Sequence, residues 1–425
     1  MTASGLLQRR FLFFVLPVVG LVGLATGATA LLGLAAAGLT LLVLARLTAY
    51  RGLLGLRASR EVFPSAFEGD PVRVRLGLEN RSRRDAWLVE LIDSFGPSLS
   101  DRQALVAGGP LRPRRRRTLA YRALCSRSWG EYRIGPLVLA TGDPLGLFRA
   151  SRTFFQLDTF TVFPRVHPVA ALDRLGARPT AATHEHTTPR AGQSLAYLGV
   201  REYRPGDDMR RIHWPATARR GALTVKEYER DLVPYFTLFL DLDRRARAGM
   251  GRKSTLEYLV RTAASIVWTA TTRGDVVQVI AEGGAPLLVP PGRGELHATR
   301  CLYELVRCHQ EGPLDLFDLV ERHRTRIPEG SALALLLGRL VFDETRLETL
   351  LVGFRARGVF PAVLIVNDAS FLPVDRWPLP PQVAEARKHA IAALLATHGV
   401  PGRILEAGDD LAAVLGRSDL LGEAA

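Results

Sequence analysis

The fold of this 425-residue chain is decided by residues 235–243, which read Tyr-Phe-Thr-Leu-Phe-Leu-Asp-Leu-Asp. Tyr235 to Leu242 is a dense apolar run of strand length, which predicts a strand buried on both faces. The acidic pair Asp241 and Asp243 falls at the carboxyl end of this strand, where open α/β sheets bind their ligands. The stretch therefore predicts a fold class and also the place to look for chemistry.

Downstream of this strand, short apolar runs alternate with amphipathic stretches. The predicted strands are 276–281, 333–337, 363–366 and 404–405, and the predicted helices are 254–273, 295–309, 344–357 and 382–398. Strands that alternate with helices of this length predict a mostly parallel sheet covered on both faces. Residues 233–425 are therefore expected to form one α/β domain.

Between residues 57 and 165 the hydrophobic period changes to two. The valines and leucines of 72–78 alternate with charged or small residues, which predicts a half-buried strand. Similar runs follow at 86–92, 118–124, 137–140 and 160–163, with turn signals between them. Many short strands with such punctuation predict a small β-sandwich. We interpret the arginine-rich run 112–117 as a charged strand edge or loop, with contact to lipid headgroups as the alternative.

The N-terminus carries no charged residue from Phe11 to Ala45. One straight helix over that stretch would be about 50 Å long, whereas the hydrocarbon core of a bilayer is about 30 Å thick. Residues 1–56 are therefore predicted to form a transmembrane helical hairpin, with spans at about 9–25 and 28–47 and a turn near Thr26-Gly27. The glycines expected to let the two helices approach closely are Gly20, Gly23, Gly33 and Gly38.

Arginines flank the apolar region on both sides, with Arg9 and Arg10 before it and Arg46 and Arg51 after it. By the positive-inside rule, this pattern predicts an inner or plasma membrane protein of the multi-pass kind, with its soluble domains in the cytoplasm. The alternative is a single tilted span with the soluble part outside the cell.

Residues 166–232 contain a linker and then a segment of unusual composition. Arginines, acids and aromatic residues are interleaved in the run Arg201-Glu202-Tyr203-Arg204-Pro205-Gly206-Asp207-Asp208-Met209-Arg210-Arg211-Ile212-His213-Trp214. An arginine can pair bidentately with a carboxylate and stack on an aromatic ring at the same time. The segment is therefore either a structural clasp or a recognition surface, and the residues alone leave both readings open.

This segment resembles the hallmark of the DUF58 proteins, R-E-Y-x-x-G-D-D-x-R-x-I-x-W-x-x-x-A-R followed by a strand ending in V-x-E-Y-E. The residues that carry the resemblance, which we call the hallmark residues, are Arg201, Glu202, Tyr203, Gly206, Asp207, Asp208, Arg211, Trp214, Ala218, Arg219 and Glu227. Residues 129–136 and 143–148 and the N-terminal hairpin also fit that family.

The resemblance implies a bacterial or archaeal membrane-anchored protein of undefined biochemical role. Its C-terminal domain is expected to be von Willebrand A-like, with a Rossmann-type parallel sheet. The partners that the resemblance implies are a MoxR-type AAA+ ATPase and other membrane proteins, besides the lipid bilayer itself.

A von Willebrand A metal site typically reads Asp-x-Ser-x-Ser and binds Mg²⁺ through oxygen ligands. In this chain Arg245 stands at the second serine position, and Gly338-Arg339 stands where the family often has Ser-Asp. An unpaired cation at Arg245 disfavours a divalent ion, so Asp241 and Asp243 are only weak metal candidates. We expect Asp241 to be paired with a nearby arginine instead, and we expect no cofactor.

Two hypotheses of function remain. In the first, the α/β domain and the hallmark residues form a docking face of a non-enzymatic scaffold that works with the ATPase. In the second, the chain is a cryptic metal-dependent hydrolase that uses Asp241, Asp243 and the hallmark acids Asp207 and Asp208. The missing serine ligands favour the first, and no nucleophile elbow, zincin motif or phosphate-binding loop is present in the sequence.

The remaining features of the sequence have plainer interpretations. His184-Glu185-His186 lies between Thr- and Pro-rich stretches and is interpreted as part of a linker. The net charge of +14 is carried almost wholly by arginine, but the run 112–117 has no interleaved aromatic residues, so no nucleic-acid partner is expected. The three cysteines, Cys125, Cys301 and Cys308, are expected to be buried thiols in a reducing compartment.

Overall fold

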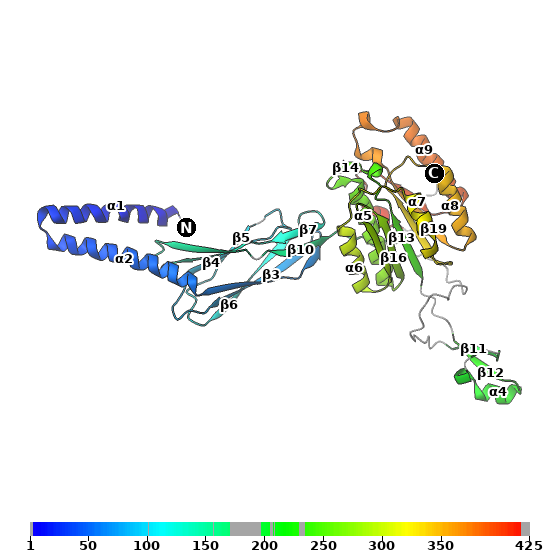
Figure 1. Cartoon of the computed structure of the whole chain (residues 1–425), viewed down its shortest axis with the longest axis horizontal. Helices are drawn as coiled ribbons and strands as arrows, with labels where there is room; N and C mark the ends of the chain where they lie inside the picture. Colours follow the sequence, from blue (N-terminus) through cyan, green and yellow to red (C-terminus); the bar gives the residue numbers. More distant parts are fainter. Residues whose placement is uncertain are drawn as a thin grey trace. The chain divides into compact units, whose positions relative to one another are not determined.

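The structure is a computed structural model, and it describes residues 3–100, 102–155, 157–170, 197–204, 207, 209–228 and 234–417. The chain divides into two compact units, Met1–Arg165 and Val166–Ala425 (Figure 1). The first unit contains an apolar helix pair and a set of short strands. The second contains a six-stranded sheet with helices. It also contains the segment that carries the hallmark residues, which we call the hallmark segment.

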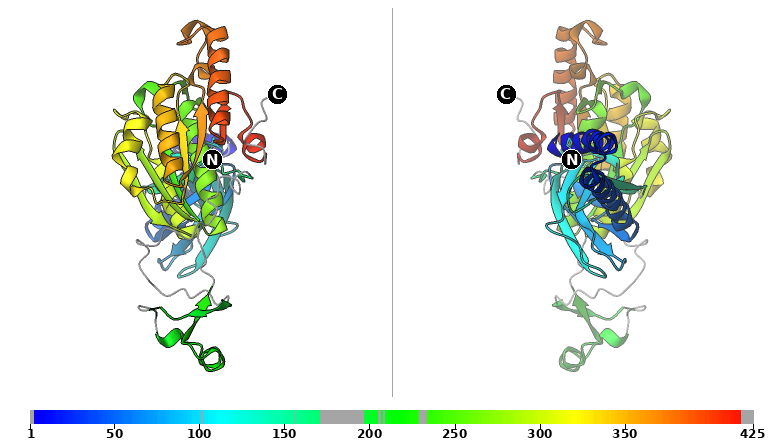
Figure 2. Two further views of the ribbon diagram at one scale, coloured as in Figure 1. Left: turned by 90° about the vertical axis from the view of Figure 1, so that its right-hand side faces the viewer. Right: turned by 90° about the vertical axis from the view of Figure 1, so that its left-hand side faces the viewer.

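The N-terminal helix pair consists of α1 (Ala3–Thr26) and α2 (Thr29–Leu54), which run side by side (Figures 1 and 2). The chain reverses at the predicted turn, where Gly27 has a φ of +70°. A Cβ atom at Gly38 would overlap Leu16 of α1, and one at Gly20 would lie 3.5 Å from the Cβ of Ala35. A Cβ atom at Gly23 would lie 3.1 Å from the Cβ of Leu31 in α2, so the predicted close approach is confirmed at these three glycines. It is wrong for Gly33, where an added Cβ would meet no atom within 4 Å.

Among the described residues, α2 is the one helix long and apolar enough to cross a membrane. The apolar part of α1, Phe11–Thr26, is shorter. An apolar helix near the N-terminus is therefore present, while a crossing by both helices and the side on which the soluble units lie stay predictions.

Among the described residues of the first unit, ten strands follow and form three small sheets, which we call the β-module. The sheets have the orders β1-β3-β6, β2-β10-β7 and β5-β4-β8-β9. The strands are β1 (Leu56–Glu61), β2 (Ser65–Phe67), β3 (Pro71–Asn80), β4 (Trp87–Ser94), β5 (Arg102–Val106), β6 (Arg116–Leu124), β7 (Gly130–Ile134), β8 (Leu137–Gly142), β9 (Arg149–Phe154) and β10 (Asp158–Phe163). Their inward residues share one hydrophobic cluster that includes Val74, Leu76, Leu91, Phe95 and Phe160.

The β-module also contains a buried ion-pair network and has arginines on one edge strand. The buried guanidinium of Arg60 pairs with Asp93 and, at 2.7 Å, with Asp158, which joins three strands. At the edge of its sheet, β6 carries Arg116 and Arg117, so the reading of the arginine run as a charged strand edge is confirmed for these two residues.

The helix pair packs directly on the β-module. Leu147 and Phe148, from the loop between β8 and β9, join Leu16 and Leu42 of the two helices in one apolar cluster. The Oγ1 atom of Thr141 donates to the carbonyl oxygen of Ala49 at 2.8 Å, which fixes the C-terminal half of α2 to β8.

The six-stranded sheet of the second unit has the order β17-β16-β13-β18-β19-β20, and β17 is the antiparallel member. The strands are β13 (Tyr235–Leu240), β16 (Val276–Glu282), β17 (Pro286–Gly292), β18 (Ala332–Leu337), β19 (Phe360–Val366) and β20 (Gly402–Leu405). Counted along the chain, this order is 3-2-1-4-5-6. The prediction of a mostly parallel sheet is confirmed, although β17 was not predicted.

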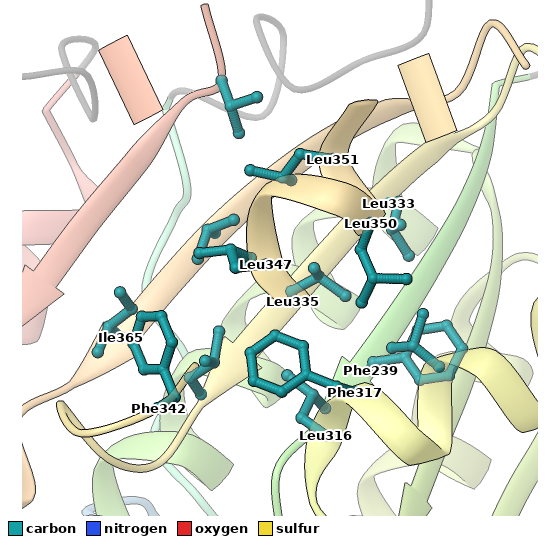
Figure 3. Packing of buried hydrophobic residues seen from close by; sticks show 14 of the residues in the cluster. Phe239, Leu316, Phe317, Leu333, Leu335, Phe342, Leu347, Leu350, Leu351 and Ile365 are labelled. Carbon is teal, nitrogen blue, oxygen red and sulfur yellow. The ribbon is translucent and has the colours of Figure 1, made fainter. Parts of the chain in front are cut away.

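Helices cover both faces of this sheet (Figure 1). They are α5 (Thr255–Arg273), α6 (Glu295–Val306), α7 (Leu316–Arg322), α8 (Glu344–Ala356), α9 (Pro381–Thr397) and α10 (Leu411–Leu415). Figure 3 shows the core on one face, where Leu347 and Leu351 of α8 and Phe317 of α7 meet Phe239 and Leu335 of the strands. Burial raises the pKa of both Cys301 and Cys308 to about 12, and with Cys125 these thiols are buried and unbridged, as predicted.

Candidate functional site

The hallmark segment folds as an antiparallel strand pair with a short helix between the strands. β11 (Tyr197–Glu202) pairs with β12 (Thr224–Tyr228), so that Arg201 lies opposite Val225. A 3₁₀ turn (Met209–Arg211) and α4 (Trp214–Arg220) fill the connection. Two further backbone bonds close the unit: Tyr203 donates to Leu223 and His213 donates to Thr224, both at 2.8 Å.

Local chemistry explains why α4 begins and ends where it does. The Nδ1 atom of His213 accepts a hydrogen bond from the backbone N–H of Ala216 at 3.0 Å, which caps the helix N-terminus. Gly221 ends the helix with a φ of +68°, a left-handed conformation that glycine adopts without steric cost. The hydroxyl of Thr217 accepts from the N–H of Thr224 at 3.1 Å and so ties α4 to β12.

Arg201 and Asp207 form a bidentate ion pair at the base of the segment. The two guanidinium nitrogens lie 2.7 Å from the two carboxylate oxygens, and the N–H of Arg204 donates to Asp207 at 2.8 Å. The hydrogen bonds from Arg201 and Arg204 hold the pKa of Asp207 at about 2. These two hallmark residues therefore form a clasp that ties Asp207 to the end of β11.

Other hallmark residues point outward. Among the residues of this segment whose burial the structure describes, Ile212, Thr224 and Val225 are buried, while Trp214 is 65% exposed and Met209 is 66% exposed. Glu202, Ala218 and Arg219 are also exposed, and Tyr203 is half-buried. Gly206 and Asp208 lie outside the described residues, as do the side chains of Arg211 and Glu227 and the run His184-Glu185-His186.

The second candidate site is the carboxyl edge of the six-stranded sheet. Asp241 follows β13 and is buried, and its carboxylate accepts from the N–H groups of Asp243 at 3.1 Å and Gly338 at 3.0 Å. Burial raises the pKa of Asp241 to about 6. The expected direct pairing of Asp241 with an arginine is therefore wrong, because backbone groups supply its hydrogen bonds.

The arginines pair with Asp243 instead. Its buried carboxylate lies 2.8 Å from the Nε atom of Arg245 and 2.7 Å from a terminal nitrogen of the same guanidinium, and Arg339 is 3.6 Å away. The positive charge of Arg339 also lowers the pKa of Asp241 and of Asp368, although burial raises the pKa of both above its ordinary value. Arg245, which we expected to be an unpaired cation, is thus paired.

This arrangement does not fit a divalent metal ion. The carboxylate of Asp243 is engaged by a guanidinium, and both carboxylate oxygens of Asp241 face backbone N–H groups. Within the part of the chain that the structure describes, no three His, Cys, Asp or Glu residues lie together as a possible ligand set. The hydrolase hypothesis therefore lacks the oxygen ligands it requires at this edge.

One residue at this edge escaped the sequence analysis. Gln310 is buried and its Oε1 atom accepts from the hydroxyl of Thr255 at 3.0 Å, while its Nε2 atom has no hydrogen-bond partner among the described residues. A Cβ atom at Gly338 would lie 3.1 Å from that Nε2 atom. Gln310 lies in a loop after α6, and no local pattern signals that the fold brings it to the sheet edge.

Comparisons with known proteins agree with part of the sequence analysis. Residues 199–338 match the family described as "Protein of unknown function DUF58". The chain is 28% identical over 188 residues to "Uncharacterized protein YeaD" of Bacillus subtilis (strain 168), and the match covers 42% of this chain and 43% of that protein. The chain thus matches less than half the length of this curated relative.

Two solved structures each match 26% of the chain. The CARDB domain of the PF1109 protein from Pyrococcus furiosus, in complex with di-metal ions, has 11% identity and a TM-score of 0.19, covering 26% of this chain and 87% of that chain. The β-glucosidase of Listeria innocua in complex with isofagomine has 10% identity and a TM-score of 0.16, covering 26% and 16%. Similarity at such TM-scores carries no argument about fold or function.

Proposed function

We propose that this chain is a membrane-anchored interaction protein of the DUF58 kind, in which the hallmark segment is the docking surface for a MoxR-type AAA+ ATPase. The proposal assigns the N-terminal helix pair to the cytoplasmic membrane, with both units in the cytoplasm. It also assigns a β-sandwich architecture to the β-module and a von Willebrand A-like fold to the α/β domain, for which the 3-2-1-4-5-6 strand order is the support.

The observation that carries the proposal is the exposure of Trp214 in a segment whose fold is held by other residues. The fold of the segment is accounted for by the Arg201–Asp207 clasp, the strand pairing and the His213 cap. Its Trp214 and Met209 side chains are left in solvent. Exposed tryptophans of this kind are typical anchors of protein interfaces, because burying them on a partner removes a large apolar area from water.

The hydrolase alternative is not supported by the carboxyl edge of the sheet. A metal-dependent mechanism needs carboxylate oxygens free to bind the ion. Those of Asp243 and Asp241 are occupied by Arg245 and by backbone N–H groups. We therefore propose that this edge has a structural role in the α/β domain.

The test is a binding measurement between the full chain in nanodiscs and the purified MoxR-type ATPase encoded in the same genome. W214A is expected to weaken binding about 30-fold, the effect of losing roughly 2 kcal/mol at an interface anchor. The matched controls are L296A and M250A, which truncate side chains 91% and 88% exposed on the α/β domain and should bind as the wild type does. Equal affinities for W214A and the controls would contradict the proposed docking surface.

A further inference from the structure

A pocket of about 410 Å³ lies where α2 meets the β-module. This volume falls within the range of small-molecule sites, about 300–1,000 Å³. Its lining includes three arginines, Arg51 from α2 and Arg83 and Arg84 from the turn between β3 and β4, with Asp85 and Trp87 beside them. The pocket therefore carries a net positive charge and one aromatic wall.

The positions of Arg83 and Arg84 are fixed by a buried asparagine. The Nδ2 atom of Asn80 donates to the carbonyl oxygens of Arg84 and Leu111, both at 2.8 Å. Its Oδ1 atom accepts from the N–H and the hydroxyl of Ser82, at 3.0 and 2.7 Å. Because every polar atom of this side chain is used, the turn is ordered before any ligand arrives.

The end of α2 is held against the same turn. The N–H of Arg81 donates to the carbonyl oxygen of Gly55 at 2.8 Å, and a Cβ atom at Gly55 would overlap Ser82. A Cβ atom at Gly52 would lie 3.7 Å from the Cα atom of Ala86. This close packing sets Arg51 beside Arg83 and Arg84 as one wall of a built pocket.

The guanidinium groups of the pocket are available for a ligand. The neighbouring Arg81 lies 3.2 Å from Glu79 and is paired, whereas Arg51, Arg83 and Arg84 form no ion pair with any residue that the structure describes. Three guanidinium groups around one cavity favour a phosphate, which arginine binds through paired N–H groups.

The position of the pocket along α2 indicates which molecule supplies that phosphate. From Thr29 to Ala45 the helix is uncharged, a length of about 26 Å that nearly matches the hydrocarbon core. Thr48 to Gly52 lie about 5–10 Å further along, in the layer of the lipid headgroups. Trp87 adds an aromatic side chain of the kind enriched at that depth.

We propose that this pocket binds the phosphate headgroup of an anionic phospholipid. The inference rests on the proposed membrane anchor and names the lipid class recognised at its inner end. A bound headgroup carries one negative charge, so it offsets part of the positive charge of the pocket and fixes the β-module against the membrane surface. Anionic lipids of the cytoplasmic leaflet supply such headgroups at high local concentration.

The test uses the full chain in nanodiscs of phosphatidylcholine with a minor fraction of phosphatidylglycerol, and native mass spectrometry of the lipids retained. The pocket variant R51Q/R83Q/R84Q is expected to lower phosphatidylglycerol retention at least about tenfold, since each arginine near an anionic surface contributes about 1 kcal/mol. The control R73Q/R75Q/R122Q removes the same charge from exposed arginines of β3 and β6 and should retain the lipid.

Two further arms separate the possible outcomes. T48W places a large side chain in the pocket without changing its charge and should lower lipid retention, whereas full retention by T48W or by the pocket variant overturns the proposal. Inorganic phosphate is titrated into nanodiscs of pure phosphatidylcholine, and phosphate binding without phosphatidylglycerol retention overturns the lipid assignment. Carbonate extraction measures membrane insertion independently. A chain that is inserted but shows no lipid preference refutes the proposed lipid site alone. A chain that carbonate extracts refutes the proposed membrane anchor and the lipid site together.

Discussion

Replacing Arg339 with glutamine removes a cation that lies among three acidic residues at the carboxyl edge of the sheet. The Arg339 side chain is 16% exposed and lies 3.6 Å from the buried carboxylate of Asp243. Its charge also favours the ionised forms of Asp241 and Asp368. Arg339→Gln therefore leaves buried negative charge that the remaining groups compensate only in part.

The size of the loss follows from the burial of each partner. Removing one member of a buried ion pair costs about 3–5 kcal/mol, and because Arg245 still holds Asp243 we expect about 2–3 kcal/mol for R339Q. Arg245 is 56% exposed, so solvent screens its charge. R245Q is therefore expected to cost about 1 kcal/mol. Arg244, an exposed neighbour, provides the control variant R244Q, which should be neutral.

The loss should depend on pH in a defined direction. Asp241 has a pKa of about 6, so below that value it carries a proton and needs no cation. R339Q should therefore be more damaging at pH 7.5 than at pH 5. A deficit that grows as the pH falls would contradict this reasoning.

Hydrogen exchange of the full chain, read on peptides that cover β13 and β18, measures the stability of the edge locally. At pH 7.5 a loss of 2 kcal/mol lowers protection about 30-fold. The order R339Q, then R245Q, then R244Q is the expected ranking. Equal protection in R339Q and R244Q would refute the assignment of Arg339 as the central cation.

Three further outcomes are expected. The pKa of Asp241 is about 6 against an ordinary 3.8, so the native state holds this proton more tightly than the unfolded chain. The contribution of this group to stability is therefore full below about pH 4 and is lost, by up to about 3 kcal/mol, as the pH rises through 6. D241N should remove this contribution to the pH dependence of denaturation curves. In the hallmark segment, R201K loses the bidentate geometry of the ion pair with Asp207 and should speed amide exchange in β11. In the wild type, acid should not break this ion pair until the pH falls toward the Asp207 pKa of about 2. In the helix pair, G38L should overpack against Leu16 and cost about 1–3 kcal/mol, while G33L, whose Cβ atom meets open space, should leave thermal stability in detergent unchanged.

The long elements of the α/β domain were predictable because their local signals agree with their tertiary surroundings. Ser254 caps the N-terminus of α5, since its hydroxyl accepts from the N–H of Glu257, and Gly274 caps the C-terminus in a left-handed conformation. Its apolar stripe faces the sheet, so pattern and burial coincide. Elements with conflicting signals were missed. β17 contains Pro290 and Pro291, which an edge strand tolerates and a central strand does not, and α7 is only seven residues long.

At the carboxyl edge of the sheet, the sequence predicted which charged residues are present but not which arginine pairs with which aspartate. The sequence shows Arg245 and Arg339 where a metal site would need oxygen ligands, and both residues do lie at the sheet edge. Which aspartate they serve depends on the register of β13 with β18. That register brings the N–H of Gly338 to Asp241, so the guanidinium groups are left to Asp243. A bond between segments 97 residues apart leaves no trace in local sequence.

The arginines of this chain fall into two classes by their partners, and the two classes should respond differently to salt. Arg60, with a side chain 1% exposed, and Arg339, with one 16% exposed, face buried carboxylates, so added salt screens them little. Arg51, Arg83 and Arg84 line an open pocket and form no ion pair with a residue that the structure describes, so any anion held there competes with ions in solution. Raising the ionic strength should therefore release the pocket ligand while the exchange rates of β13 and β18 stay constant. If the strands opened with salt instead, the buried arginines would not be the structural cations assigned here.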